Sequence, residues 1–169
     1  PRDPVVFDIA ADGHPQSITW TKRNAKVGFL VLDRDGSGGI TSGVELFGNH
    51  TPMPDGRPAP ANSNGYIALS GYDLRQFGGN ADGHIGPEDA IWPHLRIWID
   101  SNHDGVSEQA EIFSLRELGV VELGQIYSVT RLQDRYGNLF RFKSSATVVR
   151  RHGVRELVPT YDVFFRVIR

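Results

Sequence analysis

The sequence contains no cysteine, which excludes disulfide bridges, thiolate catalysis and cysteine-bound metals. An extracellular domain without disulfides needs another form of cross-link, and a bound metal ion is one. No apolar stretch is long enough to cross a bilayer, so we expect no membrane-spanning segment. The chain opens at Pro1 without a signal peptide, so we expect the remainder of a larger parent polypeptide around it. The G-x-S-x-G, P-loop, dinucleotide and H-E-x-x-H motifs do not occur either.

The composition is that of one globular domain with many turns. The chain has 169 residues, 39% of them hydrophobic, with 19 glycines and 10 prolines. Its net charge of −2 is unevenly spread. Residues 1–130 hold 17 acids against 9 Lys and Arg, whereas residues 131–169 hold 3 acids against 9. We therefore predict a single domain, 1–169, made of an acidic region over 5–120 and a basic segment over 121–169.

The most specific pattern is the twelve-residue stretch from Asp100 to Glu111. Side-chain oxygens fall at its positions 1, 3, 5, 9 and 12, and Gly105 stands at position 6, where the backbone must turn sharply. This spacing is that of the EF-hand calcium loop, in which position 7 adds a carbonyl oxygen. Its carboxylates would repel one another without a cation, which favours a calcium site over a metal-free Asp-Gly turn. The predicted ligands are Asp100, Asn102, Asp104, Val106, Glu108 and Glu111.

A second loop covers residues 33–45 and closes one residue later than the standard pattern. Ile40 at its position 8 suits the short strand by which paired loops brace each other. Ser42 and Glu45 also form an S-x-x-E capping box, which would start a short helix through Leu46. Glu45 can therefore serve the ion, the cap, or both. The predicted calcium ligands are Asp33, Asp35, Ser37, Gly39 through its carbonyl, Thr41 and Glu45.

Two further loops match the pattern in part. The first offers Asp8 and Asp12 at positions 1 and 5 but has Ala10 at position 3 and no closing acid, so a plain hairpin turn is the alternative. The third has Gly78 at position 1, and we expect Asp73 to fold back into that place. His84 would supply only its carbonyl, since no partner ligands stand at zinc-site spacing. The predicted ligands of the third loop are Asp73, Asn80, Asp82, His84 and Asp89.

Hydrophobic periodicity predicts an α+β fold, with EF-hand-like calcium loops and short helices followed by an antiparallel β-sheet segment. Helices are expected from Asn64 to about Asp73 and from Gly86 toward Trp98, the second shortened by Pro93. After Val120 the pattern alternates, which predicts antiparallel strands near 126–132, 140–143 and 163–168. Arginines alternate with aromatic residues there, but a solvated sheet face explains them better than a nucleic-acid surface. We expect no nucleic-acid partner.

Several short sequence segments, taken in order along the chain, resemble those of a known family. Phe29-Leu30-Val31-Leu32-Asp33-Arg34-Asp35-Gly36, Glu45-Leu46-Phe47-Gly48, Asn64-Gly65-Tyr66 and Leu95-Arg96-Ile97-Trp98-Ile99-Asp100 are similar to the EF-hand-like calcium-binding domain of bacterial RTX-type secreted proteins. The resemblance covers roughly residues 5–120. It implies a calcium-binding module that folds or is stabilised when calcium binds, and a secreted or cell-surface location. A protein partner docking on the basic strands or on the proline-rich loop 48–64 is a further hypothesis.

One branch of that family, the RTX self-processing module, cuts its own chain at an Asp-Pro bond when calcium arrives. Asp3-Pro4 stands at a similar distance before Asp8 in this sequence. An aspartate carboxylate can attack its own carbonyl to give a cyclic anhydride, and a protonated prolyl nitrogen is a comparatively good leaving group. Two hypotheses therefore stand: a non-enzymatic calcium-binding module, and a calcium-triggered self-cleaving module acting at Asp3 and Pro4. No other enzyme class finds support in the sequence.

Overall fold

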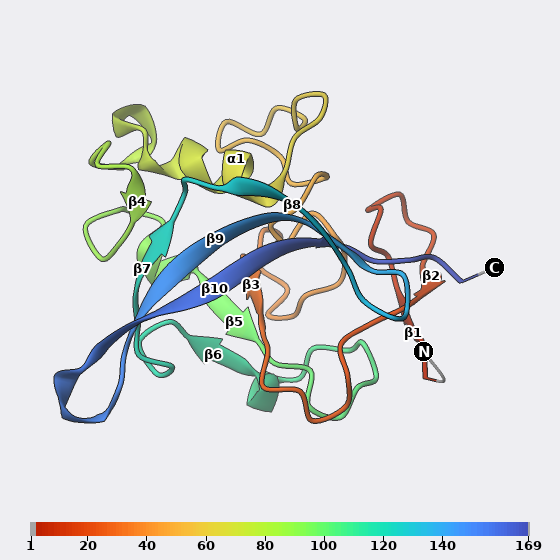
Figure 1. Ribbon diagram of the computed structural model, residues 1–169. Coiled ribbons are helices and arrows are strands. Elements are labelled where there is room, and N and C mark those ends of the chain that lie inside the picture. The colour runs from red at the N-terminus through yellow and green to blue at the C-terminus, as the bar shows by residue number, and fades with distance from the viewer. Residues whose placement is uncertain (1–2, 169) are drawn as a thin grey trace.

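The computed structural model describes residues 3–168, and β-strands dominate it (Figure 1). Every strand pairing in the three sheets is antiparallel. Near the N-terminus, β1 (Val5–Phe7) pairs with β2 (Gln16–Ile18). A central sheet has the order β3-β5-β6, formed by β3 (Phe29–Val31), β5 (Arg96–Trp98) and β6 (Ile112–Ser114).

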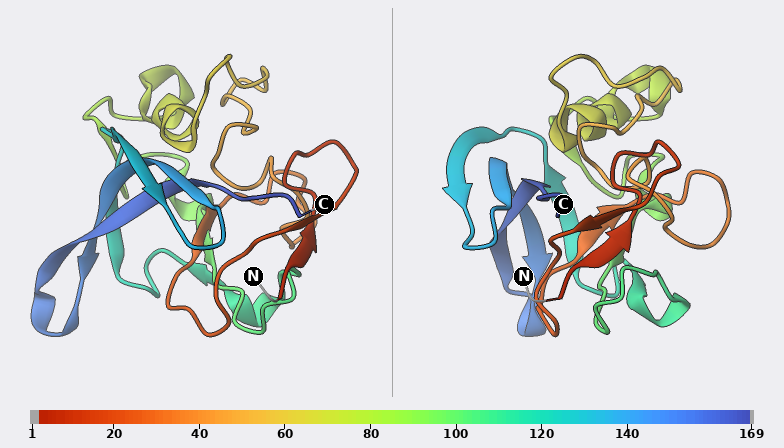
Figure 2. Two further views of the ribbon diagram at one scale, coloured as in Figure 1. Left: turned by 45° about the vertical axis from the view of Figure 1, so that its right-hand side comes forward. Right: turned by 90° about the vertical axis from the view of Figure 1, so that its right-hand side faces the viewer.

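The third sheet is built around the long strand β9 (Leu139–Val149). On one side β9 pairs with the edge strand β10 (Arg155–Phe164). The other partners of β9 follow one another along it: β8 (Ser128–Gln133) pairs with its first half, and β7 (Val120–Gly124) with its second half. The two-residue strand β4 (His84–Ile85) continues the sheet beyond β7. The turn of the β9–β10 hairpin projects away from the rest of the molecule (Figures 1 and 2).

One α-helix, α1 (Gly65–Ser70), occurs among the described residues. The Asn64 side chain caps it by accepting hydrogen bonds from the N–H groups of Tyr66 and Ile67. The other helical segments are single 3-10 turns: η1 (Gly71–Asp73), η2 (Arg75–Phe77), η3 (Trp92–His94), η4 (Gln109–Glu111) and η5 (Arg151–Gly153). None of the helices in residues 3–168 is long and apolar enough to cross a membrane.

The predicted α+β, EF-hand-like fold is therefore wrong, because no helix pair flanks any loop within residues 3–168. The expected helix from Gly86 toward Trp98 is replaced by η3 and then by β5. Pro93 removes a backbone donor, and pairing of β5 with both β3 and β6 supplies hydrogen bonds that outweigh helical periodicity. The expected helix through Leu46 is also missing, since Leu46 lies in a bridge with Val31. The helix predicted from Asn64 does form.

Of the three strands predicted in the basic segment, two form near the expected residues as β8 and β9, although β9 continues to Val149. The last strand differs more. It was expected near 163–168, but β10 already ends at Phe164. Beyond β10 the chain returns to the N-terminal strands, where Val167 forms a bridge with Ile18. The N–H of Thr19 donates to the carbonyl of Arg166 at 2.9 Å. The end of the basic segment is thereby hydrogen-bonded to the start of the acidic region.

Two buried clusters of hydrophobic residues hold the sheets together. The first lies between β1, β2 and the central sheet and includes Phe7, Trp20 and Trp98. Its rings touch, with the centroids of Trp20 and Trp98 5.7 Å apart. The second, which includes Leu69, Ile85 and Leu95, lies between α1 and the third sheet. The central sheet borders both, so the loops that leave its strands start from well-packed positions.

Candidate metal centres

Four acidic loops have the same hydrogen-bond pattern. We name them loop 1 (8–13), loop 2 (33–45), loop 3 (73–89) and loop 4 (100–111). In each, the carboxylate of the first aspartate accepts the N–H groups of positions 5 and 6, and the position-6 glycine has a positive φ. The Asp8 carboxylate accepts from the N–H groups of Asp12 and Gly13 at 3.1 and 2.9 Å, and the Asp33 carboxylate from those of Ser37 and Gly38 at 3.2 and 2.9 Å. The Asp73 carboxylate accepts from Asp82 and Gly83 at 3.2 and 2.9 Å, and the Asp100 carboxylate from Asp104 and Gly105 at 3.2 and 3.0 Å.

Loop 2 brings its carboxylates closest together. One oxygen each of Asp33, Asp35 and Glu45 lie within 4.8 Å of one another, and this set could hold a metal ion. Glu45 is buried and accepts the N–H groups of Arg34 at 3.3 Å and Thr41 at 2.7 Å. Its carboxylate therefore closes the loop and does not cap a helix. Hydrogen bonds from the Ser37 hydroxyl and N–H hold the pKa of Asp35 below its usual value, which keeps it ionised.

Loop 4 is closed by Glu111, which accepts the N–H groups of Ser101 at 2.7 Å and Asn102 at 3.3 Å. The Asn102 amide nitrogen donates to the carboxylates of Asp104 at 3.0 Å and Glu108 at 3.1 Å. A hydrogen bond shared with Glu111, together with burial and the negative charges nearby, raises the pKa of Glu108. A cation would relieve this crowding of negative charge. Val106 is exposed, and its N–H donates to Asp104 at 2.8 Å.

Loop 3 acquires its first aspartate from outside the contiguous pattern. Asp73, at the end of η1, folds back over Gly79, where a Cβ would collide with the Asp73 main chain. The closing Asp89 is buried and accepts the N–H groups of Asn80 at 3.2 Å and Gly86 at 2.7 Å. Hydrogen bonds from the Asn80 side chain and then the His84 N–H lower the pKa of Asp82. The His84 ring belongs to no group of potential metal ligands within residues 3–168.

Loop 1 has no closing acid and is attached to loop 2 instead. The Asp8 carbonyl accepts the N–H of Gly43 at 2.8 Å, and Asp8 and Ser42 form a parallel bridge. Asp12 is exposed, and its carboxylate accepts only the N–H of His14 among the described hydrogen bonds. Loop 1 therefore resembles a structural support for loop 2 more than a fourth metal site.

Loops 2 and 4 meet at their eighth positions. The N–H of Ile40 donates to the Ser107 hydroxyl at 2.6 Å, and that hydroxyl lies 3.3 Å from the Ile40 carbonyl. We expected Ile40 at position 8 to pair with a partner loop through a short strand. The two loops do meet at this position, but the Ser107 hydroxyl makes the contact in place of strand pairing. Loops 1, 2 and 4 thus form one connected group, while loop 3 lies beside α1, across the molecule from the N-terminus (Figure 1).

Two tryptophans connect loop 4 to the aromatic cluster, a contact for which the sequence carries no signal. The Trp20 indole donates to Asp100 at 2.7 Å, and the Trp98 indole donates to Glu111 at 3.3 Å. Both carboxylates are buried. An ion bound to them would change the electrostatic environment of both indole rings.

We therefore expect calcium to change the intrinsic tryptophan emission through loop 4. Trp20→Phe and Trp98→Phe should each reduce the change in emission during a calcium titration. Trp92→Phe is the matched control, because no hydrogen bond described within residues 3–168 joins the Trp92 indole to a loop carboxylate; only its backbone N–H reaches loop 3, donating to the Asp89 carbonyl at 3.0 Å. Asp33→Asn in loop 2 should also leave most of the signal. A calcium-dependent signal that disappears with Trp92 alone would contradict the link between the indoles and loop 4.

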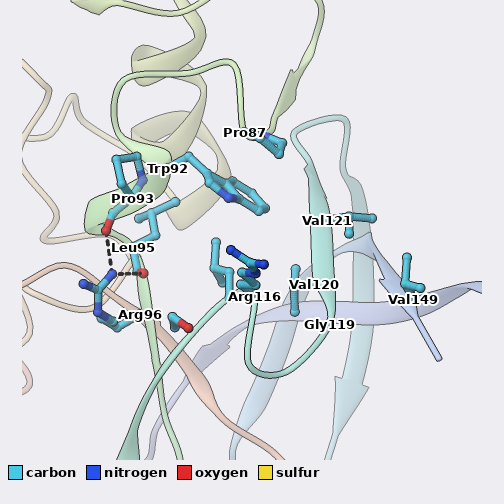
Figure 3. Close-up of a pocket in the computed structure, with 12 residues that line it drawn as sticks. Pro87, Trp92, Pro93, Leu95, Arg96, Arg116, Gly119, Val120, Val121 and Val149 are labelled. Atoms are coloured by element: carbon cyan, nitrogen blue, oxygen red, sulfur yellow. Dashed lines mark hydrogen bonds between the residues drawn. The ribbon is translucent and has the colours of Figure 1, made fainter. Parts of the chain in front are cut away.

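A pocket next to loop 3 is lined mainly by apolar residues, and its chemistry does not suit a cation. Trp92, Leu95 and Val120 are among the residues that line it (Figure 3). The charged residues in the lining, Arg96 and Arg116, are both basic. Arg96 donates to the main-chain oxygens of its neighbours, as the dashed lines in Figure 3 show.

The chain is similar to known proteins over nearly its whole length. The family model for the SPM domain matches residues 2–165. The chain is 35% identical over 142 residues to the iron-regulated protein FrpA of Neisseria meningitidis serogroup C. This similarity covers 84% of the chain but 12% of FrpA, so the chain spans a small part of that relative's length. The chain belongs to the SPM domain family.

Proposed function

We propose that this chain is a calcium-binding module of a secreted or surface bacterial protein of the RTX type, and that calcium binding folds or stiffens it. The main support is loop 2, where one carboxylate oxygen each of Asp33, Asp35 and Glu45 lie close enough together to hold a metal ion. Loops 3 and 4 share its hydrogen-bond pattern, in which the N–H groups of positions 5 and 6 hold the carboxylate of the first aspartate. In loops 2, 3 and 4 a buried acid, Glu45, Asp89 or Glu111, closes the arrangement.

The donor set fits a hard cation. The gathered side chains offer carboxylate, amide and hydroxyl oxygens, which calcium prefers, and no thiolate is available. Loop 2 would bind with Asp33, Asp35, Ser37, Thr41 and Glu45, loop 3 with Asp73, Asn80, Asp82 and Asp89, and loop 4 with Asp100, Asn102, Asp104, Glu108 and Glu111. Gly39, His84 and Val106 would add carbonyl oxygens. We assign loop 1 no ion, because it lacks a closing acid.

Removing one closing acid should remove one calcium ion. Asp89→Asn retains the shape of the side chain but removes the charge that closes loop 3. Glu88→Gln, at the exposed neighbouring position, is the matched control because it changes the net charge equally. Isothermal titration should give one fewer ion for Asp89→Asn than for Glu88→Gln. Equal stoichiometry in the two variants would exclude loop 3 as a site.

A second candidate function is calcium-triggered cleavage of the Asp3–Pro4 bond. The observation that favours it is the position of this dipeptide against loop 4. Arg23 donates to the Asp3 carboxylate at 3.1 Å and to the Asn102 carbonyl at 2.7 Å. The self-processing modules that the sequence resembles cut at such a bond, and the SPM domain match begins at residue 2.

Mass spectrometry of the chain before and after calcium addition tests this function. Calcium should release the fragment Pro1-Arg2-Asp3 and leave a new N-terminus at Pro4. Asp3→Asn should abolish the reaction, because the amide is a much poorer nucleophile than the carboxylate. The Asp55→Asn variant, with its change in the distant proline-rich loop, should cleave like the original chain. An intact chain after prolonged incubation with calcium would leave calcium binding as the sole proposal.

A further inference from the structure

His103 reaches the bond that the second proposal would cut. Its Nε2 atom lies 2.8 Å from the carbonyl oxygen of Asp3, the oxygen of the Asp3–Pro4 peptide bond. A carbonyl oxygen can only accept, so Nε2 carries the hydrogen and donates it. His103 is position 4 of loop 4, a position that the calcium pattern leaves without a ligand. The contact spans a hundred residues of sequence.

The His103 imidazole is held with one ring nitrogen unpaired. The residue's backbone φ of 64° is a feature of the loop, because position 4 also has a positive φ in the other three loops, at Ala11, Gly36 and Ala81. Its side chain is buried, and Nδ1 has no hydrogen-bond partner among residues 3–168. Burying an unpaired polar atom costs stability, and a catalytic role is one explanation for such an atom in a folded protein.

We propose that His103 is a catalytic residue which stabilises the negative charge that develops on the Asp3 carbonyl oxygen during cleavage. This inference rests on the proposed cleavage of the Asp3–Pro4 bond. A donor that is already aimed at the oxygen where charge appears stabilises the transition state without having to reorganise. The imidazole is buried, so water screens this interaction little.

The reaction that His103 would assist can be written with all atoms and electrons accounted for. A side-chain oxygen of Asp3 bonds to the Asp3 carbonyl carbon, and the carbonyl π electrons move onto the oxygen that faces His103. When the C=O bond re-forms, the bond to Pro4 breaks, and the prolyl nitrogen keeps the electron pair and takes a proton from water. The products are a free Pro4 amine and a cyclic anhydride at Asp3. A second water molecule opens the anhydride to two carboxyl groups.

The placement of His103 also explains how calcium could act as the trigger. The His103 N–H donates to Asp100 at 2.6 Å, so a proposed calcium ligand sets the position of the imidazole. Asn102, another proposed ligand, holds Arg23 through its carbonyl, and Arg23 in turn holds the Asp3 carboxylate. An ion that orders residues 100–104 would therefore fix both the nucleophile and the oxygen donor. Ordering of this kind brings reacting groups into near-attack geometry.

Cleavage rates of two variants of the full chain at saturating calcium test the role of His103. Asn readily adopts a positive φ, but in His103→Asn it is too short to reach the Asp3 oxygen. This variant should cleave about 100- to 1000-fold more slowly, the range measured when one oxyanion donor is removed. His103→Gln places an amide N–H near the position of Nε2 and should retain a rate well above that of His103→Asn. Mass spectrometry follows the release of Pro1-Arg2-Asp3, and the melting temperature with calcium shows that each variant folds.

The outcomes separate this inference from the proposals on which it rests. If the unaltered chain does not cleave with calcium, the proposed cleavage fails and the role of His103 fails with it. If it cleaves and His103→Asn cleaves equally fast, His103 has no catalytic role. The same conclusion follows if His103→Gln is as slow as His103→Asn while both fold. Should His103→Asn not fold, His103→Ala replaces it in the comparison with His103→Gln, because alanine already occupies this position with a positive φ in loops 1 and 3, at Ala11 and Ala81.

Discussion

Calcium added to the metal-free chain is expected to raise its melting temperature by about 5–10 °C for each loop that binds an ion. A ligand that binds only the folded state stabilises it by about 2.7 kcal/mol at a hundredfold excess over Kd. For a domain of this size, each kcal/mol corresponds to a shift of about 2–4 °C. Removing the repulsion among the carboxylates of loops 2 and 4 is the physical source of the gain.

The double variant Asp33→Ala with Asp100→Ala should lose most of this shift. Each substitution removes the carboxylate that the N–H groups of positions 5 and 6 hold in place. Asp55→Ala is the control, because Asp55 lies outside the acidic loops and pairs with Arg57. Differential scanning calorimetry with calcium, and again with a chelator, gives the shift directly. An unaltered chain that melts at the same temperature in both conditions would contradict the proposed function.

Local patterns in the sequence predicted the loops better than they predicted the elements around them. The spacing of oxygen-bearing side chains and glycines is a local property, so positions 5 and 6 of each loop, and position 1 of loops 1, 2 and 4, could be identified from the sequence. The structure places even Asp73 in loop 3, where the gap at Gly78 led us to expect it. The helix at Gly86 failed because β5 finds its hydrogen-bond partners in β3 and β6, far away in the sequence.

The contacts that join the loops to the rest of the molecule were not predictable from one sequence. Glu45 had two possible roles, and only the fold shows that its carboxylate turns inward to Thr41. The indole of Trp20 meets Asp100 across eighty residues, and His103 meets Asp3 across a hundred. Periodicity describes which face of an element is buried, but it carries no information about which distant polar group lies against it.

Gly43→Ala is expected to destabilise the chain by about 3 kcal/mol or more, because Gly43 lies where loop 2 touches loop 1. A Cβ at this position would lie 2.8 Å from the Ile9 carbonyl carbon and closer still to its oxygen. Both atoms belong to the main chain, so a change of rotamer cannot relieve the clash. Loop 1 would have to move away, which would break the hydrogen bond from the Gly43 N–H to the Asp8 carbonyl.

Gly48→Ala is the matched control for Gly43→Ala, five residues further along the chain. An added Cβ at Gly48 meets no atom within 4 Å, and Gly48 does not have a positive φ. Alanine there should leave stability unchanged or raise it slightly, since it restricts the unfolded chain. Urea denaturation of both variants measures the difference in the free energy of unfolding. Because Gly43 is two residues from Glu45, Gly43→Ala should also weaken calcium binding at loop 2. Similar stabilities for the two variants would show that loop 1 can leave loop 2 at little cost, and that it does not support the metal site.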